Sequence, residues 1–107
     1  MIPAAPYETE RLDWQGIMVE VRYTPDWSAS YREVYGYPLA HLEIESVAPA
    51  KAPLPITETG YLSHFCAPAD VDAEGGPAPY VRMWLDHEAQ SDSWKQSQAE
   101  RAQLSLF

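Results

Sequence analysis

Two segments of this chain alternate in character with a period of two residues, and this pattern constrains the fold more than any other feature. The first runs from Gly16 to Thr24 and the second from Ala40 to Ser46. The side chains expected on a shared buried face are Ile17, Val19, Val21 and Tyr23 in the first segment, and Leu42 and Ile44 in the second. Because successive side chains of a strand point to opposite faces, both segments are predicted to be strands with one buried face.

A helix is predicted further along the chain, from Pro79 to about Gln90. Proline suits the first turn of a helix, where its missing N–H group has no intrahelical partner. The apolar stripe of this helix consists of Val81, Trp84 and Leu85, with Tyr80 and Met83 beside them. The segment Ser91-Asp92-Ser93 is expected to end it and to cap a second helix that begins near Trp94.

The remaining segments carry weaker signals. Residues 56–65 predict one more strand, broken or bulged at Gly60, and residues 70–77 predict an acidic loop. The aromatic-rich residues 27–37 fit either a short helix or a strand. Since strands come first and helices last, we expect a small α+β domain with an antiparallel sheet and one or two C-terminal helices.

The predicted organisation has three parts. Residues 1–15 are interpreted as an N-terminal arm, because residues 1–10 contain two prolines and show no periodicity. Residues 16–93 form the α+β domain. Residues 94–107 form a polar tether that ends in a short apolar peptide.

Charge and composition exclude several classes of protein. Seven Lys and Arg residues against sixteen Asp and Glu residues give a net charge of −9 over 107 residues, so direct binding of nucleic acid is not expected. No apolar run approaches the roughly 20 residues that cross a bilayer, and residues 1–6 do not resemble a secretory signal. The single cysteine, Cys66, has no partner for an internal disulfide, which fits a reducing compartment. We therefore expect a cytoplasmic protein without a membrane partner.

Evidence for catalysis or metal binding is sparse. His64 and Cys66 lie two residues apart, but paired spacings of the kind that hold zinc are absent, so we expect neither a metal site nor a cofactor. Cys66 with His64 or His41 supplies the residue types of a thiolate–imidazole pair, and Glu58 adds a carboxylate. No nucleophile elbow or phosphate loop accompanies them. A small enzyme around Glu58, His64 and Cys66 is a minority hypothesis, and no residue is assigned as catalytic.

The acidic side chains support a different hypothesis. A surface of carboxylates can imitate the charge of DNA, and the chain would then inhibit a host nuclease or defence complex, as anti-CRISPR or anti-restriction proteins do. The simpler interpretation is that negative charge keeps the protein soluble. The seven tyrosines and four tryptophans likewise fit either a binding platform or the core of a small domain.

The last five residues carry the most specific signal. After the polar stretch 97–103, three large apolar side chains appear within four positions. The pentapeptide Gln103-Leu104-Ser105-Leu106-Phe107 resembles the consensus peptide with which bacterial proteins bind the replication sliding clamp. The resemblance implies that Gln103 places its amide in a polar subsite, that Leu106 and Phe107 fill a hydrophobic pocket, and that Leu104 and Ser105 connect them. The expected partner is the bacterial DNA polymerase sliding clamp, to which the protein either recruits its domain or competes with host proteins.

A second resemblance concerns the middle of the chain. Residues 21–25, 41–45 and 53–61 resemble small uncharacterised proteins carried on bacterial plasmids and other mobile DNA. The resemblance implies no activity, but it fits a role in DNA replication or in the takeover of a host.

Overall fold

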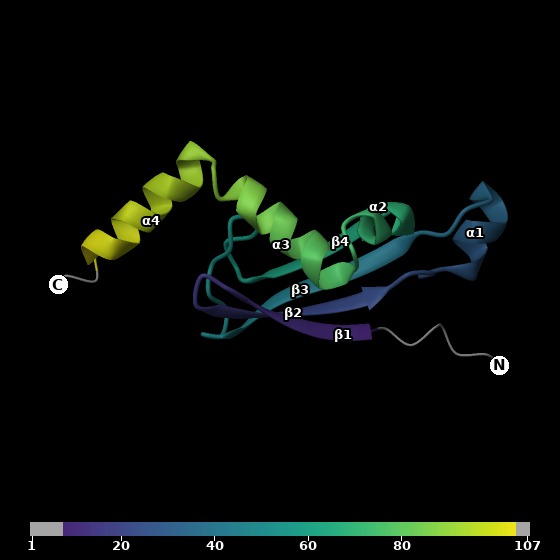
Figure 1. Ribbon diagram of the computed structural model, residues 1–107, viewed down its shortest axis with the longest axis horizontal. Coiled ribbons are helices and arrows are strands. Elements are labelled where there is room, and N and C mark those ends of the chain that lie inside the picture. The colour runs from purple at the N-terminus through teal and green to yellow at the C-terminus, as the bar shows by residue number, and fades with distance from the viewer. Residues whose placement is uncertain (1–7, 105–107) are drawn as a thin grey trace.

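The computed structural model describes residues 8–104 and contains one antiparallel sheet of four strands in the order β1-β2-β3-β4 (Figure 1). The strands are β1 (Glu8–Trp14), β2 (Ile17–Thr24), β3 (Ala40–Ala48) and β4 (Tyr61–Cys66). The helices are α1 (Ala29–Tyr35), α2 (Pro68–Ala73), α3 (Pro77–Glu88) and α4 (Asp92–Leu104). The predicted α+β class and the C-terminal helices are confirmed.

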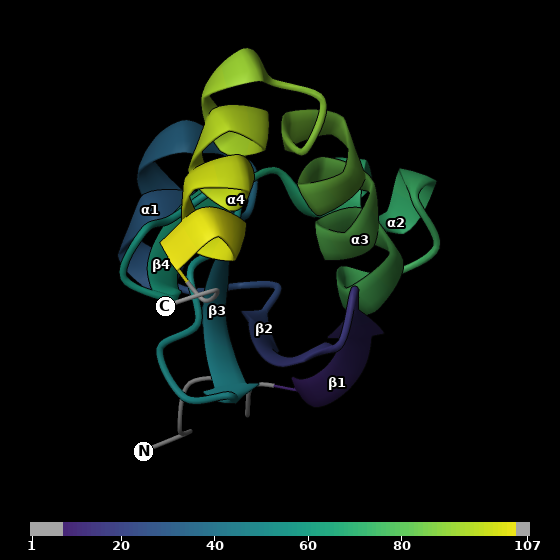
Figure 2. The same ribbon diagram turned by 90° about the vertical axis from the view of Figure 1, so that its left-hand side faces the viewer.

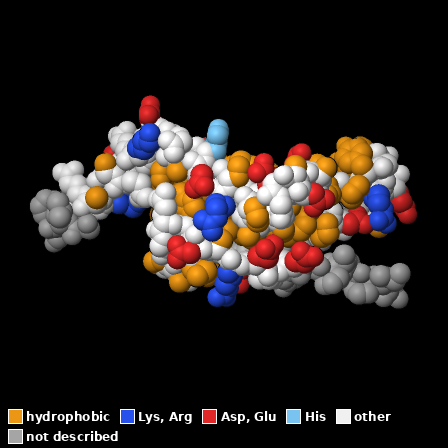
Figure 3. All heavy atoms as spheres, viewed as in Figure 1, with side chains coloured by type: hydrophobic (Ala, Val, Ile, Leu, Met, Phe, Trp, Pro, Cys, Tyr) orange, Lys and Arg blue, Asp and Glu red, His pale blue; other side chains and the backbone are white. Residues whose placement is uncertain are grey.

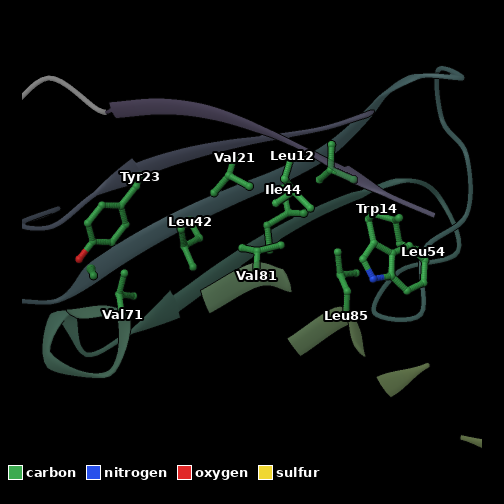
Figure 4. Close-up of a cluster of buried hydrophobic side chains, with 12 residues drawn as sticks. Leu12, Trp14, Val21, Tyr23, Leu42, Ile44, Leu54, Val71, Val81 and Leu85 are labelled. Atoms are coloured by element: carbon green, nitrogen blue, oxygen red, sulfur yellow. The ribbon is translucent and has the colours of Figure 1, made fainter. Parts of the chain in front are cut away.

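The core lies between one face of the sheet and helices α2 and α3 (Figure 4). The sheet contributes Leu12, Trp14, Val19, Val21, Tyr23, Ala40, Leu42 and Ile44, and the helices contribute Val71, Val81 and Leu85. Leu54, from the connection between β3 and β4, completes this cluster. Val81 and Leu85 are fully buried, as the predicted apolar stripe requires, whereas Trp84 is half-buried. In the described part of the chain, no helix covers the opposite face of the sheet (Figure 2).

The predicted arm over residues 1–15 is wrong for residues 8–14, which form strand β1. In the register with β2, Leu12 lies opposite Val19 and Trp14 opposite Ile17. Leu12 and Trp14 are buried, and the indole Nε1 of Trp14 donates a hydrogen bond to Asp86 of α3 at 2.9 Å. The sequence does not predict this strand, because Glu8 and Glu10 occupy the other two positions on the face of Leu12 and Trp14. Apolar residues therefore alternate only at the end of the strand.

The structure decides one segment that the sequence leaves open and differs in detail from the predictions for two others. The aromatic-rich segment 27–37 contains helix α1, whose first turn is capped when the Ser28 hydroxyl accepts a hydrogen bond from the Tyr31 N–H. The predicted acidic loop over residues 70–77 begins inside helix α2, which starts at Pro68. Strand β4 starts directly after Gly60, so the glycine precedes the strand and does not interrupt it.

Helix α4 extends beyond the end of the sheet and carries the chain away from the core (Figures 1 and 2). None of its residues is buried, which agrees with the polar composition of the predicted tether. The tether is therefore helical from Asp92 to Leu104. Within residues 8–104, no helix is both long enough and apolar enough to span a bilayer.

Candidate functional site

Helix α4 is attached to the body of the domain through Trp94. The ring centroids of Trp94 and Trp14 lie 6.1 Å apart. The guanidinium carbon of Arg101 lies 5.0 Å from the centroid of the Trp94 indole, within the range of a cation–π interaction. The Ser91 hydroxyl accepts a hydrogen bond from the Trp94 N–H at 3.2 Å and so caps the first turn. These contacts hold the start of α4 while leaving its end exposed.

The first two residues of the pentapeptide form the end of α4. Gln103 and Leu104 are both exposed, and 72% of the Leu104 surface is accessible. Ser105, Leu106 and Phe107, on which the sliding-clamp hypothesis also depends, lie outside the described residues. Because Gln103 and Leu104 are helical here, an extended pentapeptide requires the last turn of α4 to unwind. An exposed, polar helix end opposes such unwinding only weakly, since little packing holds it.

A groove of about 430 Å³ lies where α4 meets the connection between β3 and β4. Its apolar floor is formed by the prolines at positions 53 and 55, Ile56 and Trp94, and its polar rim includes Glu58 and Arg101. No sequence pattern predicted this groove, because its two walls come from distant parts of the chain.

The three residues of the enzyme hypothesis come from two parts of the chain: His64 and Cys66 lie two residues apart on one face of β4, and Glu58 lies before that strand. Glu58 is exposed in the loop before β4, whereas Cys66 ends that strand. His64 lies on the helix-covered face, where its ring centroid is 4.5 Å from that of Trp84. Burial lowers the pKa of His64 and raises the pKa of the Cys66 thiol, which Asp70 raises further. A neutral thiol beside a neutral imidazole is a poor nucleophilic pair.

The histidines are separated as well. His41 lies on the open face of the sheet, where its Nε2 is 2.6 Å from the Ser63 hydroxyl, while His87 lies at the exposed end of α3. Among residues 8–104, the structure brings together no group of three potential metal ligands.

The open face of the sheet carries an ion-pair network centred on Arg22. Its guanidinium lies 2.6 Å from Glu20, 2.8 Å from Glu43 and 3.1 Å from Glu45, and Arg11 reaches Glu20 at 3.1 Å. Hydrogen bonds from Arg22 lower the pKa of Glu43, and those from Arg11 and Arg22 lower the pKa of Glu20. These carboxylates are therefore charged but partly neutralised. This face offers little support for DNA mimicry, which requires unpaired negative charge.

Exposed aromatic side chains gather at the opposite end of the molecule from α4 (Figure 3). Tyr31, Tyr35 and Tyr37 contact one another around α1, and Trp27 packs edge-on against Phe65 with ring centroids 4.8 Å apart. Of the aromatic residues, Trp14 and Tyr23 lie in the core, Trp84 and Trp94 are half-buried against it, and Trp27, Tyr35, Tyr37 and Phe65 are exposed at this end.

A comparison with known families identifies the family of the domain described above. The family model of the KlcB third domain matches residues 7–94, from the start of β1 to the first turn of α4. The chain belongs to the KlcB third domain family. The matched region leaves out nearly all of α4 and the whole pentapeptide 103–107. No curated protein and no solved structure matches the chain.

Proposed function

We propose that this protein, of bacterial or mobile-element origin, binds the bacterial replication sliding clamp through residues 103–107. In this proposal the KlcB-type domain is the cargo, and α4 is the spacer that presents the peptide. Binding either recruits the domain to replicating DNA or displaces host proteins that use the same site on the clamp.

The observation that supports the proposal most is the exposure of Leu104 at the end of a helix without buried residues. A large apolar side chain on a surface helix normally packs against the core or serves a partner. In α4 the contact with the core is made by Trp94, in the first turn, whereas Leu104 is the last residue of the helix. Leu104 is therefore available to a partner without unpacking the domain.

The side chains of the pentapeptide suit a binding pocket that has both a polar and an apolar part. A Gln103 amide can both donate and accept hydrogen bonds, which gives orientation. Burying a leucine and a phenylalanine side chain each contributes about 1.5–3 kcal/mol, which gives affinity. The polar α4 adds reach, since its 13 residues span about 20 Å at about 1.5 Å per residue.

A competition experiment tests the proposal directly. The full chain is bound to an immobilised bacterial sliding clamp and challenged with the free peptide Gln-Leu-Ser-Leu-Phe or with a scrambled peptide of the same composition. The proposal expects displacement by the first peptide and none by the second.

Salt distinguishes this mode of binding from binding by an acidic surface. Contacts of a Leu-Phe pair are apolar, so raising the ionic strength leaves the affinity nearly unchanged, whereas charge contacts are screened. Binding that resists the free peptide but disappears in salt would replace the proposal with the DNA-mimic hypothesis. Absence of binding at high micromolar protein would contradict the proposal.

A further inference from the structure

The two edges of the sheet differ sharply in charge. Strand β1, at one edge, contains four charged residues among its seven, whereas the six residues of β4, at the other edge, include no Asp, Glu, Lys or Arg. Edge strands expose unpaired backbone groups, and charged side chains are a common protection against pairing with another chain. On a chain with a net charge of −9, β4 is an unprotected edge.

Three alternate residues of β4 direct their backbone groups away from β3, and at two of them these groups are free. The Ser46 N–H donates to the Gly60 carbonyl at 2.8 Å, and hydrogen-bonded pairs alternate along an antiparallel ladder, so the even-numbered residues of β4 pair with β3. Tyr61, Ser63 and Phe65 therefore direct their N–H and C=O groups away from β3. The hydroxyls of two threonines, at positions 57 and 59, donate to the Tyr61 carbonyl. Within residues 8–104, the backbone groups of Ser63 and Phe65 on this side have no hydrogen-bond partner.

The side chains of the same three residues lie on the open face of the sheet. Tyr61 and Phe65 are large side chains, yet each is 44% exposed. They lie two positions before and two positions after Ser63. Ser63, between them, is small and uncharged. Along its exposed face the strand therefore carries an aromatic side chain on each side of a small one. This arrangement is symmetrical about Ser63.

We propose that β4 pairs with β4 of a second copy of this chain, antiparallel, about a twofold axis at Ser63. In this register Ser63 lies opposite its own counterpart, and Tyr61 of each copy lies opposite Phe65 of the other. Ser63 forms the central hydrogen-bonded pair of the new ladder, and the Phe65 carbonyl of each copy accepts from the Tyr61 N–H of the other, whereas the Tyr61 carbonyl keeps its bonds from Thr57 and Thr59. The two four-stranded sheets become one continuous sheet of twice as many strands.

The symmetry of β4 favours a second copy over an unrelated extended peptide. A twofold contact requires a surface that is complementary to itself, and the aromatic residues at equal distances from Ser63 meet this requirement. Cross-strand aromatic pairs are among the favourable pairs in antiparallel sheets. Glu43 and Glu45, on the open face of the neighbouring strand β3, are both bonded to Arg22, so neither is an unpaired negative charge beside the contact.

Charge-swap variants at position 63 test both the contact and its register. Sedimentation equilibrium of the wild-type chain should show a concentration-dependent mass approaching twice the 12.1 kDa of one chain. Ser63→Lys and Ser63→Glu should each sediment as monomers, because like charges then face each other across the axis. An equimolar mixture of the two variants should recover the dimer, since an ammonium group of one copy then lies opposite a carboxylate of the other.

The matched control is Ser63→Ala. All three variants lose the hydrogen bond between the Ser63 hydroxyl and His41, but alanine adds no charge and should remain dimeric. Far-ultraviolet circular dichroism confirms that each variant is folded, and recovery on mixing is itself evidence that the charged variants are folded.

Four results would overturn the proposal. They are a monomeric wild-type chain up to millimolar concentration, a dimer that persists in Ser63→Lys, a mixture that stays monomeric, and a dimer that forms only after residues 1–7 or 105–107 are removed. The last would show that the chain's own segment occupies the edge. None of these experiments involves the sliding clamp, so their failure is independent of the proposed function.

Discussion

The indole rings of Trp14 and Trp94 lie 6.1 Å apart, with an angle of 53° between their planes, and this pair joins α4 to the sheet. Trp14 is buried, and its Nε1 is bonded to Asp86, so it is fixed by both the sheet and α3. Trp94 packs against this fixed ring from the first turn of α4. The direction in which α4 leaves the domain therefore depends on one aromatic contact.

Replacing Trp94 with alanine should release α4 from the domain. We expect the free energy of unfolding to fall by about 1–2 kcal/mol, roughly half the cost of truncating a fully buried tryptophan, because Trp94 is only half-buried. Helical signal should fall as well, since an isolated 13-residue polar helix is marginal in water. Urea unfolding followed by circular dichroism measures both quantities. Lys95→Ala, on the exposed side of the same turn, is the control and should change neither.

Gly60 should tolerate no side chain, whereas Gly36 should tolerate one at modest cost. Both have a positive φ, of +78° and +79°. A Cβ atom at Gly60 would lie 2.7 Å from the backbone carbon of Lys51, but a Cβ atom at Gly36 would meet nothing within 4 Å. Gly36→Ala should therefore show the left-handed penalty of about 1–2 kcal/mol alone, and Gly60→Ala a clearly larger loss. Equal losses in thermal unfolding would show that the loop of Lys51 moves away freely.

Acid should weaken the network around Arg22. The pKa values of Glu20 and Glu43 are lowered in the folded protein, so the unfolded chain binds protons more readily than the folded one as the pH falls below about 4.5. The stability that these carboxylates contribute is fully present above that pH and is lost as the pH falls through their folded pKa values. The free energy of unfolding of the wild-type protein should exceed that of Arg22→Gln by about 1 kcal/mol at about pH 7. This difference should shrink as the pH falls towards about 3.

The matched control is Arg32→Gln, which removes a single exposed ion pair, with Asp26, instead of the centre of a network. At about pH 7 it should lower the free energy of unfolding by less than Arg22→Gln does, because isolated exposed pairs contribute about 0–1 kcal/mol. A gap for Arg22→Gln that does not change with pH would contradict the network's role in acid stability.

Sequence patterns predicted the elements whose apolar residues repeat with a clear period. The buried faces of strands β2 and β3 are apolar apart from Ser46 of β3, and Val81 and Leu85 mark the buried side of α3. Strand β1 was missed because its inward-facing Glu8 and Glu10 lie at the margin of the sheet, where water still reaches them. The sequence does not decide between a helix and a strand for residues 27–37, because helix α1 has no buried side and so shows no apolar stripe.

The surfaces were harder to predict than the core. Residues 20, 22, 43 and 45 alternate with the predicted buried residues of their strands, but the gathering of three carboxylates around the guanidinium of Arg22 depends on strand register. The free edge of β4 depends on strand order, which no local pattern encodes. For the pentapeptide the sequence supplies the signal, and the structure adds the exposure of Leu104.

The most direct test of the proposed function compares the affinities of four chains for a bacterial sliding clamp by isothermal titration calorimetry. The chains are wild type, Leu106→Ala/Phe107→Ala, Gln103→Ala and Lys95→Ala, each also followed by thermal unfolding. We expect the double variant to lose detectable binding with its melting temperature nearly unchanged, since each loss of about 1.4 kcal/mol is a tenfold loss of affinity. Gln103→Ala should bind more weakly than wild type but measurably, and Lys95→Ala should bind as wild type does. Wild-type protein that shows no binding at high micromolar concentration, or a double variant that unfolds, would contradict the proposal.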